Sequence, residues 1–260
     1  MATVRLSASA FRVLTDHLRV AVPAVIRLPP AGFRPEDRRA ELDDAMTELR
    51  GLVDARGDVD GILAGRLRIL DQAKWIIDVV AHVDGPANAV LAATDRRAVQ
   101  VIQSGQLVTV RPARPTALGD QVVRLLPAVS AGYGRSVSLP TEALRKAAAE
   151  AGTDPRKLET ALQRHGIGRD NAHLIVVMNQ DPLHTAQFGV TLTDDNGRRH
   201  RGEHVIGWWC NDSGGYLIEE HTSTSGEPWT TISPTDAARL ARQIDRLVSR
   251  PRPANEPGTA

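Results

Sequence analysis

The chain has 260 residues, of which 42% are apolar and 24% are charged, with 32 basic and 31 acidic side chains and one cysteine. A chain of this length can bury enough surface for one large domain or two small ones without disulfides. The formal net charge of +1 provides no attraction for phosphate backbones, so we expect no nucleic acid partner. Cys210 has no second cysteine to pair with in the chain, which fits a reducing compartment.

No apolar run reaches the roughly 18 residues that a membrane-spanning helix needs. The best run, residues 75–83, is interrupted by Asp78 and His82. Near the N-terminus, residues 15–17 (Thr-Asp-His) break the apolar stretch that a secretory signal requires. We therefore expect a cytoplasmic protein without membrane insertion.

Helical spacing dominates the first 70 residues. Phe11, Leu14 and Leu18 lie on one face behind Ser7 and Ser9, either of which can cap a helix that ends near Arg19. A second, amphipathic helix is predicted from Pro35 to about residue 53, and a shorter one over residues 62–70. Between the first two, the β-branched run at residues 24–28 predicts a short strand that ends at Pro29.

Two regions of the chain share one pattern of four short strands followed by a helix. The first has segments 74–83, 87–94, 98–103 and 107–111, with Pro115 opening a helix through residue 126; the second has segments 186–193, 203–210, 215–221 and 228–232, with Pro234 opening a helix through residue 247. We interpret this as an internal duplication, whose two antiparallel meanders either join into one sheet or pack about a pseudo-twofold axis.

This pattern predicts one domain over residues 1–250, with halves at about 1–130 and 131–250. Between the meanders, helices are predicted over residues 141–151 and after Asp154, which can cap a helix with Pro155 at its first position. Residues 170–180 suit a helix by spacing and a strand by β-branched content. The tail, residues 251–260, lacks apolar anchors and is predicted to be disordered.

One motif suggests an enzyme. His200, Glu203 and His204 match the H-x-x-E-H order of an inverted zinc-protease motif, which needs both imidazoles on one helical face. However, Asn196-Gly197 is a strong hairpin-turn signal just before the motif, and the residues after it have strand character. A solvated hairpin is therefore the preferred interpretation, and we expect no catalytic residue, metal or cofactor, with a zinc-dependent hydrolase as the alternative.

Trp208 and Trp209 are adjacent in a predicted strand, so their indoles point to opposite faces of the sheet. One is expected to face helices. The other is either covered by the paired half of the protein or available to a partner.

At these positions the sequence resembles the EspG family, the cytosolic substrate-binding chaperones of ESX (type VII) secretion systems. The resemblance spans residues 4–248 and is most specific at the acidic turn, glycine and tyrosine of residues 212–216. The family usually has an arginine where Gly215 stands, so no salt bridge of that arginine is implied here. The matching segments are residues 23–26, 187–189, 208–209, 211–217 and 229–236.

The resemblance implies an α+β protein with a central antiparallel sheet, quasi-twofold halves and flanking helices. It also implies a non-enzymatic chaperone that binds the tip of a helical PE–PPE-like heterodimer or a WXG-type helical protein, keeps it soluble and delivers it for export. A homodimer, or a self-assembling structural subunit of the secretion apparatus, is the other possibility. Our candidate partner contacts are Asp95, Arg96 and Arg97 in the first hairpin, and Trp208 or Trp209 on the sheet.

Overall fold

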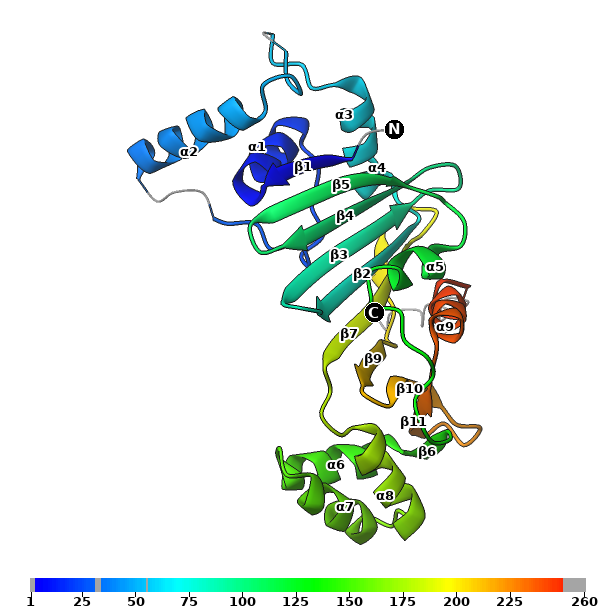
Figure 1. Ribbon diagram of the computed structural model, residues 1–260. Coiled ribbons are helices and arrows are strands. Elements are labelled where there is room, and N and C mark those ends of the chain that lie inside the picture. Colours follow the sequence, from blue (N-terminus) through cyan, green and yellow to red (C-terminus); the bar gives the residue numbers. More distant parts are fainter. Residues whose placement is uncertain (1–2, 31–33, 55, 250–260) are drawn as a thin grey trace, which may run out of the picture.

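The computed structural model describes residues 3–30, 34–54 and 56–249. The tail predicted to be disordered, residues 251–260, lies outside these ranges. Within them the chain forms an α+β fold built on one large antiparallel sheet, with helices on both of its faces (Figure 1).

The sheet has 11 strands in the order β1-β5-β4-β3-β2-β7-β9-β10-β11-β6, and β8 pairs with β7 beside this path. Every strand pairing is antiparallel. The strands are β1 (Val4–Ser7), β2 (Trp75–His82), β3 (Pro86–Ala93), β4 (Ala98–Ser104), β5 (Leu107–Ala113), β6 (Val137–Pro140), β7 (His184–Thr193), β8 (Arg199–Arg201), β9 (Ile206–Asn211), β10 (Gly214–Thr222) and β11 (Pro228–Pro234).

Both predicted meanders are present and they join into one sheet. The first comprises β2 to β5 in consecutive order, and the second comprises β7, β9, β10 and β11. They join because β2 pairs with β7, with Asp78 opposite Gly189 at the centre of the ladder. Strand β9 begins at Ile206 rather than at the predicted residue 203.

Two edge strands lie outside the two predicted meanders. β1 lies beside β5 at one edge and β6 lies beside β11 at the other, and each leads directly into a helix. Each has only four residues, too few for a period-two pattern to stand out in the sequence.

The helices cover the sheet in three groups, and each group has its own apolar core. The helices α1, α3 and α4 cover the β1–β5 end of one face, and α6, α7 and α8 cover the β10–β6 end of the same face. The opposite face carries α5 and α9 across its middle (Figure 1). The helices are α1 (Ala8–Leu18), α2 (Pro35–Glu48), α3 (Gly61–Leu67), α4 (Ile69–Gln72), α5 (Leu118–Val123), α6 (Thr141–Ala151), α7 (Pro155–Arg164), α8 (Arg169–Met178) and α9 (Ala237–Ser249).

Side-chain caps explain several helix starts. Ser7 accepts a hydrogen bond from the amide of Ala10 at the start of α1, and Asp154 accepts from Arg156 and Lys157 at the start of α7. Asp236 accepts from the amide of Arg239 just before α9 in the same way. These side chains satisfy amides that the first helical turn leaves free.

Residues 24–28 do not form the predicted strand. The Arg27 amide donates to Oε1 of Gln103, and the Arg27 carbonyl accepts from Nε2 of the same side chain, both at 2.7 Å. A buried side chain thus satisfies backbone groups that a neighbouring strand would otherwise satisfy. The ambiguous segment 170–180 is helical up to Met178, the end of α8, because its apolar side chains Ile175 and Met178 pack onto the sheet at helical spacing.

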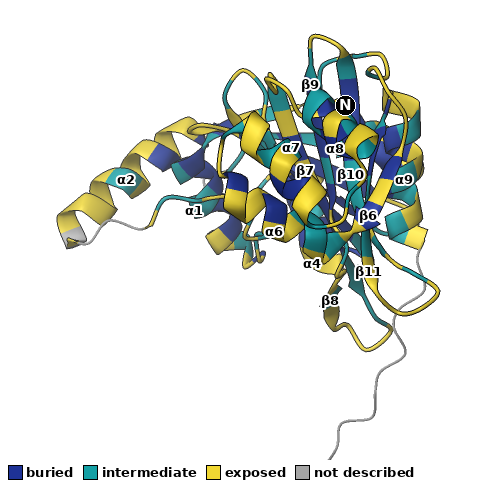
Figure 2. Cartoon of the chain, turned by 90° about the horizontal axis from the view of Figure 1, so that it is seen from below, coloured by how far each residue is buried: buried dark blue, intermediate teal, exposed yellow. Residues whose placement is uncertain are grey.

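Two predicted helices are shorter than expected. The helix after Pro115 is only α5, which begins at Leu118 after Ala117 in a left-handed conformation. α2 ends at Glu48 and buries little, leaving Leu42 and Met46 exposed. Figures 1 and 2 both show α2 projecting from the body of the protein.

In the described part of the chain, no helix has both the length and the apolar character required to span a bilayer.

Candidate partner-binding surface

Among the residues that the structure describes, no helix lies over the middle of one sheet face. The helices α1, α3 and α4 cover one end of this face and α6 to α8 the other, while the centre lies at the β2–β7 pairing (Figure 1). We call this centre the open face. It consists of the strand residues Asp78, Val80, His82, Thr185, Gln187, Gly189 and Arg201, together with Leu183 and Val205, which immediately precede β7 and β9.

Strand alternation places these residues together. In β2, Ile77 and Val79 are buried in the core under α5 and α9, so Asp78, Val80 and His82 point to the other side. In β7, Ala186 and Phe188 belong to that same core, which puts Thr185 and Gln187 on the open face. Val80 and Gln187 are direct cross-strand partners and both are exposed.

Three exposed apolar side chains lie on this face. Val80 is 43% exposed, Leu183 56% and Val205 39%. Leu183 extends the β7 ladder through its amide, which donates to Cys210 at 2.8 Å, and Val205 immediately precedes Ile206, whose side chain is in the opposite core. Exposed apolar groups on a sheet face that no described helix covers are consistent with a protein interaction site.

A single ion pair lies in the centre of the open face. Arg201 binds Asp78 through both terminal nitrogens, and Nη2 is 2.9 Å from Oδ2. The Asp78 side chain is 13% exposed, whereas that of Arg201 is 52% exposed. The guanidinium lies over Gly189 of β7, where a Cβ atom would collide with it.

The β7–β8 hairpin positions Arg201. Its turn is held by Asp194, whose carboxylate accepts hydrogen bonds from the amides of Asn196 and Arg198 and lies 2.8 Å from the His200 ring. The His200 ring and these amides hold the pKa of Asp194 below its ordinary value. This is the hairpin that the sequence predicts at Asn196-Gly197.

The zinc-site geometry is therefore not formed. His200 lies on β8, while Glu203 and His204 follow in a loop, so the two imidazoles do not share a helical face. In the part of the chain that the structure describes, no cluster of three or more His, Cys, Asp or Glu side chains is placed to hold a metal.

Both tryptophans are buried, on opposite faces as predicted. Trp208 is 3% exposed in the core beneath α5 and α9. Trp209 is 8% exposed, stacks on Tyr216 at 5.6 Å between ring centroids, and donates from Nε1 to the Met178 carbonyl at 2.8 Å. Helix α8 of the same half covers Trp209, so neither indole is available to a partner in this structure.

Asp95, Arg96 and Arg97 form the exposed turn between β3 and β4, away from the open face. Asp95 pairs with Lys74 at 3.4 Å, and Arg97 donates to the Gln72 side chain at 3.2 Å. Arg96 is exposed, and its backbone amide donates a hydrogen bond to the Thr94 hydroxyl. The sequence pattern predicts this turn but carries no local signal for Val80, Leu183 or Arg201.

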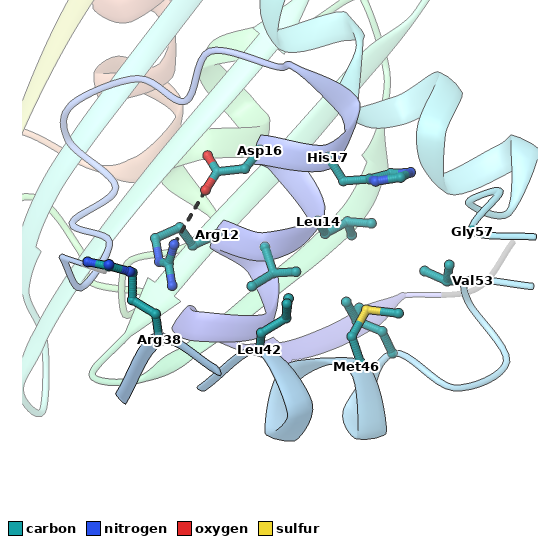
Figure 3. Close-up of a pocket in the computed structure, with 11 residues that line it drawn as sticks. Arg12, Leu14, Asp16, His17, Arg38, Leu42, Met46, Val53 and Gly57 are labelled. Atoms are coloured by element: carbon teal, nitrogen blue, oxygen red, sulfur yellow. Dashed lines mark hydrogen bonds and ion pairs between the residues drawn. The ribbon is translucent and has the colours of Figure 1, made fainter. Parts of the chain in front are cut away.

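A pocket lies between α1 and α2. Its volume is about 360 Å³, and Leu42 and Met46 of α2 point toward Leu14 of α1 across it (Figure 3). Arg12 lines the same pocket and pairs with Asp16 at 3.4 Å and Glu41 at 2.8 Å. It lies on the outer side of α1 and is separate from the open face.

Gly215 stands where the family that the sequence resembles usually has an arginine, and other residues pack closely around it. A Cβ atom there would lie 2.7 Å from the Thr235 carbonyl oxygen and 2.9 Å from Cγ2 of Val129. The position therefore does not accommodate an arginine without movement of the backbone around it.

Comparison with known proteins agrees with this architecture. The family model described as "EspG family" matches residues 7–246. Among solved structures, the chain is similar to the type VII secretion system chaperone EspG5 of Mycobacterium tuberculosis, determined in complex with the PE25–PPE41 dimer. The two are 15% identical, the match covers 95% of this chain and 96% of EspG5, and the TM-score is 0.74. No curated protein sequence matches significantly.

The likeness to EspG5 establishes the fold, whereas the family match extends over nearly the whole sequence. It includes the second meander, the hairpin and both strands that meet at the open face. The chain belongs to the EspG family.

Proposed function

We propose that this protein is a chaperone of type VII secretion that covers the tip of a helical PE–PPE-like heterodimer with its open face. The observation that carries the proposal is the uncovered sheet centre with its exposed Val80, Leu183 and Val205, lying between two helical groups. Membership of the EspG family and the likeness to EspG5, which was solved with the PE25–PPE41 dimer, support the same partner class.

The physical task is to shield apolar surface. A helical hairpin that exposes apolar residues at its tip aggregates unless the tip is covered. An open sheet face flanked by helices offers apolar contact area and a defined shape, and needs no chemical step. We therefore propose binding without catalysis, in the cytoplasm, with release by a competing receptor.

Co-expression tests this proposal. The chain is produced with the PE–PPE-type pair encoded in its own secretion locus, and the products are analysed by size-exclusion chromatography with mass determination. We expect one soluble complex with one copy of each of the three chains. A pair that elutes alone, or that precipitates equally with and without the chain, contradicts the proposal.

Matched aspartate variants locate the surface. Val80→Asp and Leu183→Asp place a carboxylate within the proposed interface and are expected to weaken binding by about tenfold or more, because that charge would be desolvated. The controls are Leu107→Asp and Ile62→Asp, at apolar residues with similar exposure of 46% and 61% that lie away from the open face. Equal losses in all four variants would contradict the proposed location.

Other features remain secondary proposals. Asp95, Arg96 and Arg97 are proposed as an additional contact, supported by their exposure. A WXG-type partner or a homodimer would be recognised by the mass of the complex. We also propose that residues of about 1–130 and 131–250 are copies of one unit within a single domain, supported by the mirrored strand order about the β2–β7 pairing.

A further inference from the structure

We propose that Arg201 recognises the substrate by donating hydrogen bonds to the free carbonyl oxygens in the last turn of a helix at the substrate tip. This inference rests on the proposed function, since it concerns which contact the open face makes with the partner that binds there.

The guanidinium has unused donors that face outward. An arginine side chain carries five N–H groups. Asp78 engages both terminal nitrogens from one side in a bidentate arrangement, which occupies two of these groups. The rest of the fork is accessible, because the Arg201 side chain remains 52% exposed while Asp78 is largely covered.

The Arg201 guanidinium lies directly against the backbone of Gly189. A Cβ atom at this position would collide with the Arg201 guanidinium, although the backbone of Gly189 is not in the left-handed region. The need for a glycine at position 189 therefore does not come from its backbone conformation. The missing side chain instead allows the planar guanidinium to approach the β7 backbone closely, where Asp78 pairs with Gly189 across the sheet.

The surroundings determine what kind of group would fit. Val80 is exposed two residues after Asp78 on the same face of β2, so a partner that covers Val80 also reaches Arg201. Donors that are buried without acceptors cost binding free energy, so the partner must supply oxygen atoms at this point.

A helix C-terminus matches this requirement. The last turn of an α-helix has four carbonyl oxygens without intrahelical partners, and together they carry a partial negative charge. Asp78 already balances the full charge of Arg201, so a dipolar acceptor suits the pair better than a second carboxylate. The tip of a helical hairpin contains such a helix end by its construction.

The test measures affinity in the complete complex. The dissociation constant of the full-length chain for the PE–PPE-type heterodimer of its own locus is determined for Arg201→Gln, Arg201→Lys and Gly189→Ala. Arg201→Lys keeps the charge but loses the fork, and Gly189→Ala keeps the arginine but displaces its guanidinium. We expect each to weaken binding by about tenfold or more.

Arg198→Gln is the matched control, because Arg198 is an exposed arginine in the turn of the same hairpin. It is expected to bind within about twofold of wild type. Thermal unfolding of each variant in the absence of partner separates loss of contact from loss of fold. Wild-type affinity in both Arg201→Gln and Gly189→Ala would overturn the inference and leave the proposed function intact.

Salt dependence identifies the acceptor. With carbonyl acceptors, the loss caused by Arg201→Gln should be nearly the same at about 50 mM and about 300 mM NaCl. A loss that largely disappears at the higher salt would assign a carboxylate acceptor and overturn the assignment to a helix end. Failure of the wild-type chain to bind the pair at all would instead overturn the proposed function, and this inference with it.

Discussion

Gly215 offers a quantitative test of how tightly the second half of the sheet is packed. An added Cβ atom would lie 2.7 Å from the Thr235 carbonyl oxygen and 2.9 Å from Val129 Cγ2. The first of these atoms belongs to the backbone and cannot rotate away. The glycine is also held at both ends, because its amide donates to Ser130 at 2.8 Å and its carbonyl accepts from Gly132 and Thr235 at 3.0 and 2.8 Å.

Gly215→Ala should therefore destabilise the protein. Overpacking of this kind costs about 1–3 kcal/mol of unfolding free energy. In a chain of this size each kcal/mol lowers the unfolding midpoint by roughly 2–4 °C, so we expect a decrease of about 2–12 °C. The assay is thermal and urea unfolding monitored by circular dichroism.

The control is the same substitution at Gly65, inside α3. An added Cβ there meets nothing within 4 Å, and alanine is the better helix former by about 0.5–1 kcal/mol. Gly65→Ala is thus expected to raise the midpoint, so the two variants should differ in sign. A Gly215→Ala protein that unfolds at or above the wild-type midpoint would refute the packing argument.

Three further predictions follow from single contacts. Trp209→Phe removes the 2.8 Å donor of the Met178 carbonyl and leaves it only the 3.4 Å hydrogen bond from Nδ2 of Asn211, so it should cost about 1 kcal/mol and increase hydrogen exchange in α8; unchanged exchange there would contradict this. Asp154→Ala removes the cap of α7 and should cost about 1 kcal/mol in urea unfolding, whereas Asp154→Asn should retain most of it. Because the folded-state pKa of Asp194 is lowered, its stabilising contribution is present above the unfolded pKa and is lost as the pH falls below about 4. The stability difference between wild type and Asp194→Asn should therefore shrink across that range, and a constant difference would contradict the role of the charged carboxylate.

Much of the fold could be predicted because its signals are local. The meanders were recognisable from period-two runs bounded by turn residues such as Asn196-Gly197, and α7 from Asp154 followed by a proline. Where a distant residue satisfied the backbone, local reasoning was wrong. Residues 24–28 have strand composition, but the side chain of Gln103, 76 positions from Arg27, takes the place of a neighbouring strand.

The candidate site was less predictable. The alternation of side chains along a strand correctly predicts that Trp208 and Trp209 lie on opposite faces of the sheet. It does not indicate that helices cover both faces at that point. Val80 resembles its buried neighbour Val79 in sequence and differs only because no helix lies above it. The exposure of a strand residue depends on the arrangement of elements that are remote in the chain.

The sequence by itself determined the strand and helix types, the near-neutral charge and the resemblance to one family, since these depend on residue chemistry and on spacing within a few positions. Only the tertiary structure decided that the meanders meet at β2 and β7, and that the centre of one face is left open. It also brought Arg201 onto Asp78, 123 positions away. Such contacts depend on register and on the placement of whole layers, which no short stretch of sequence encodes.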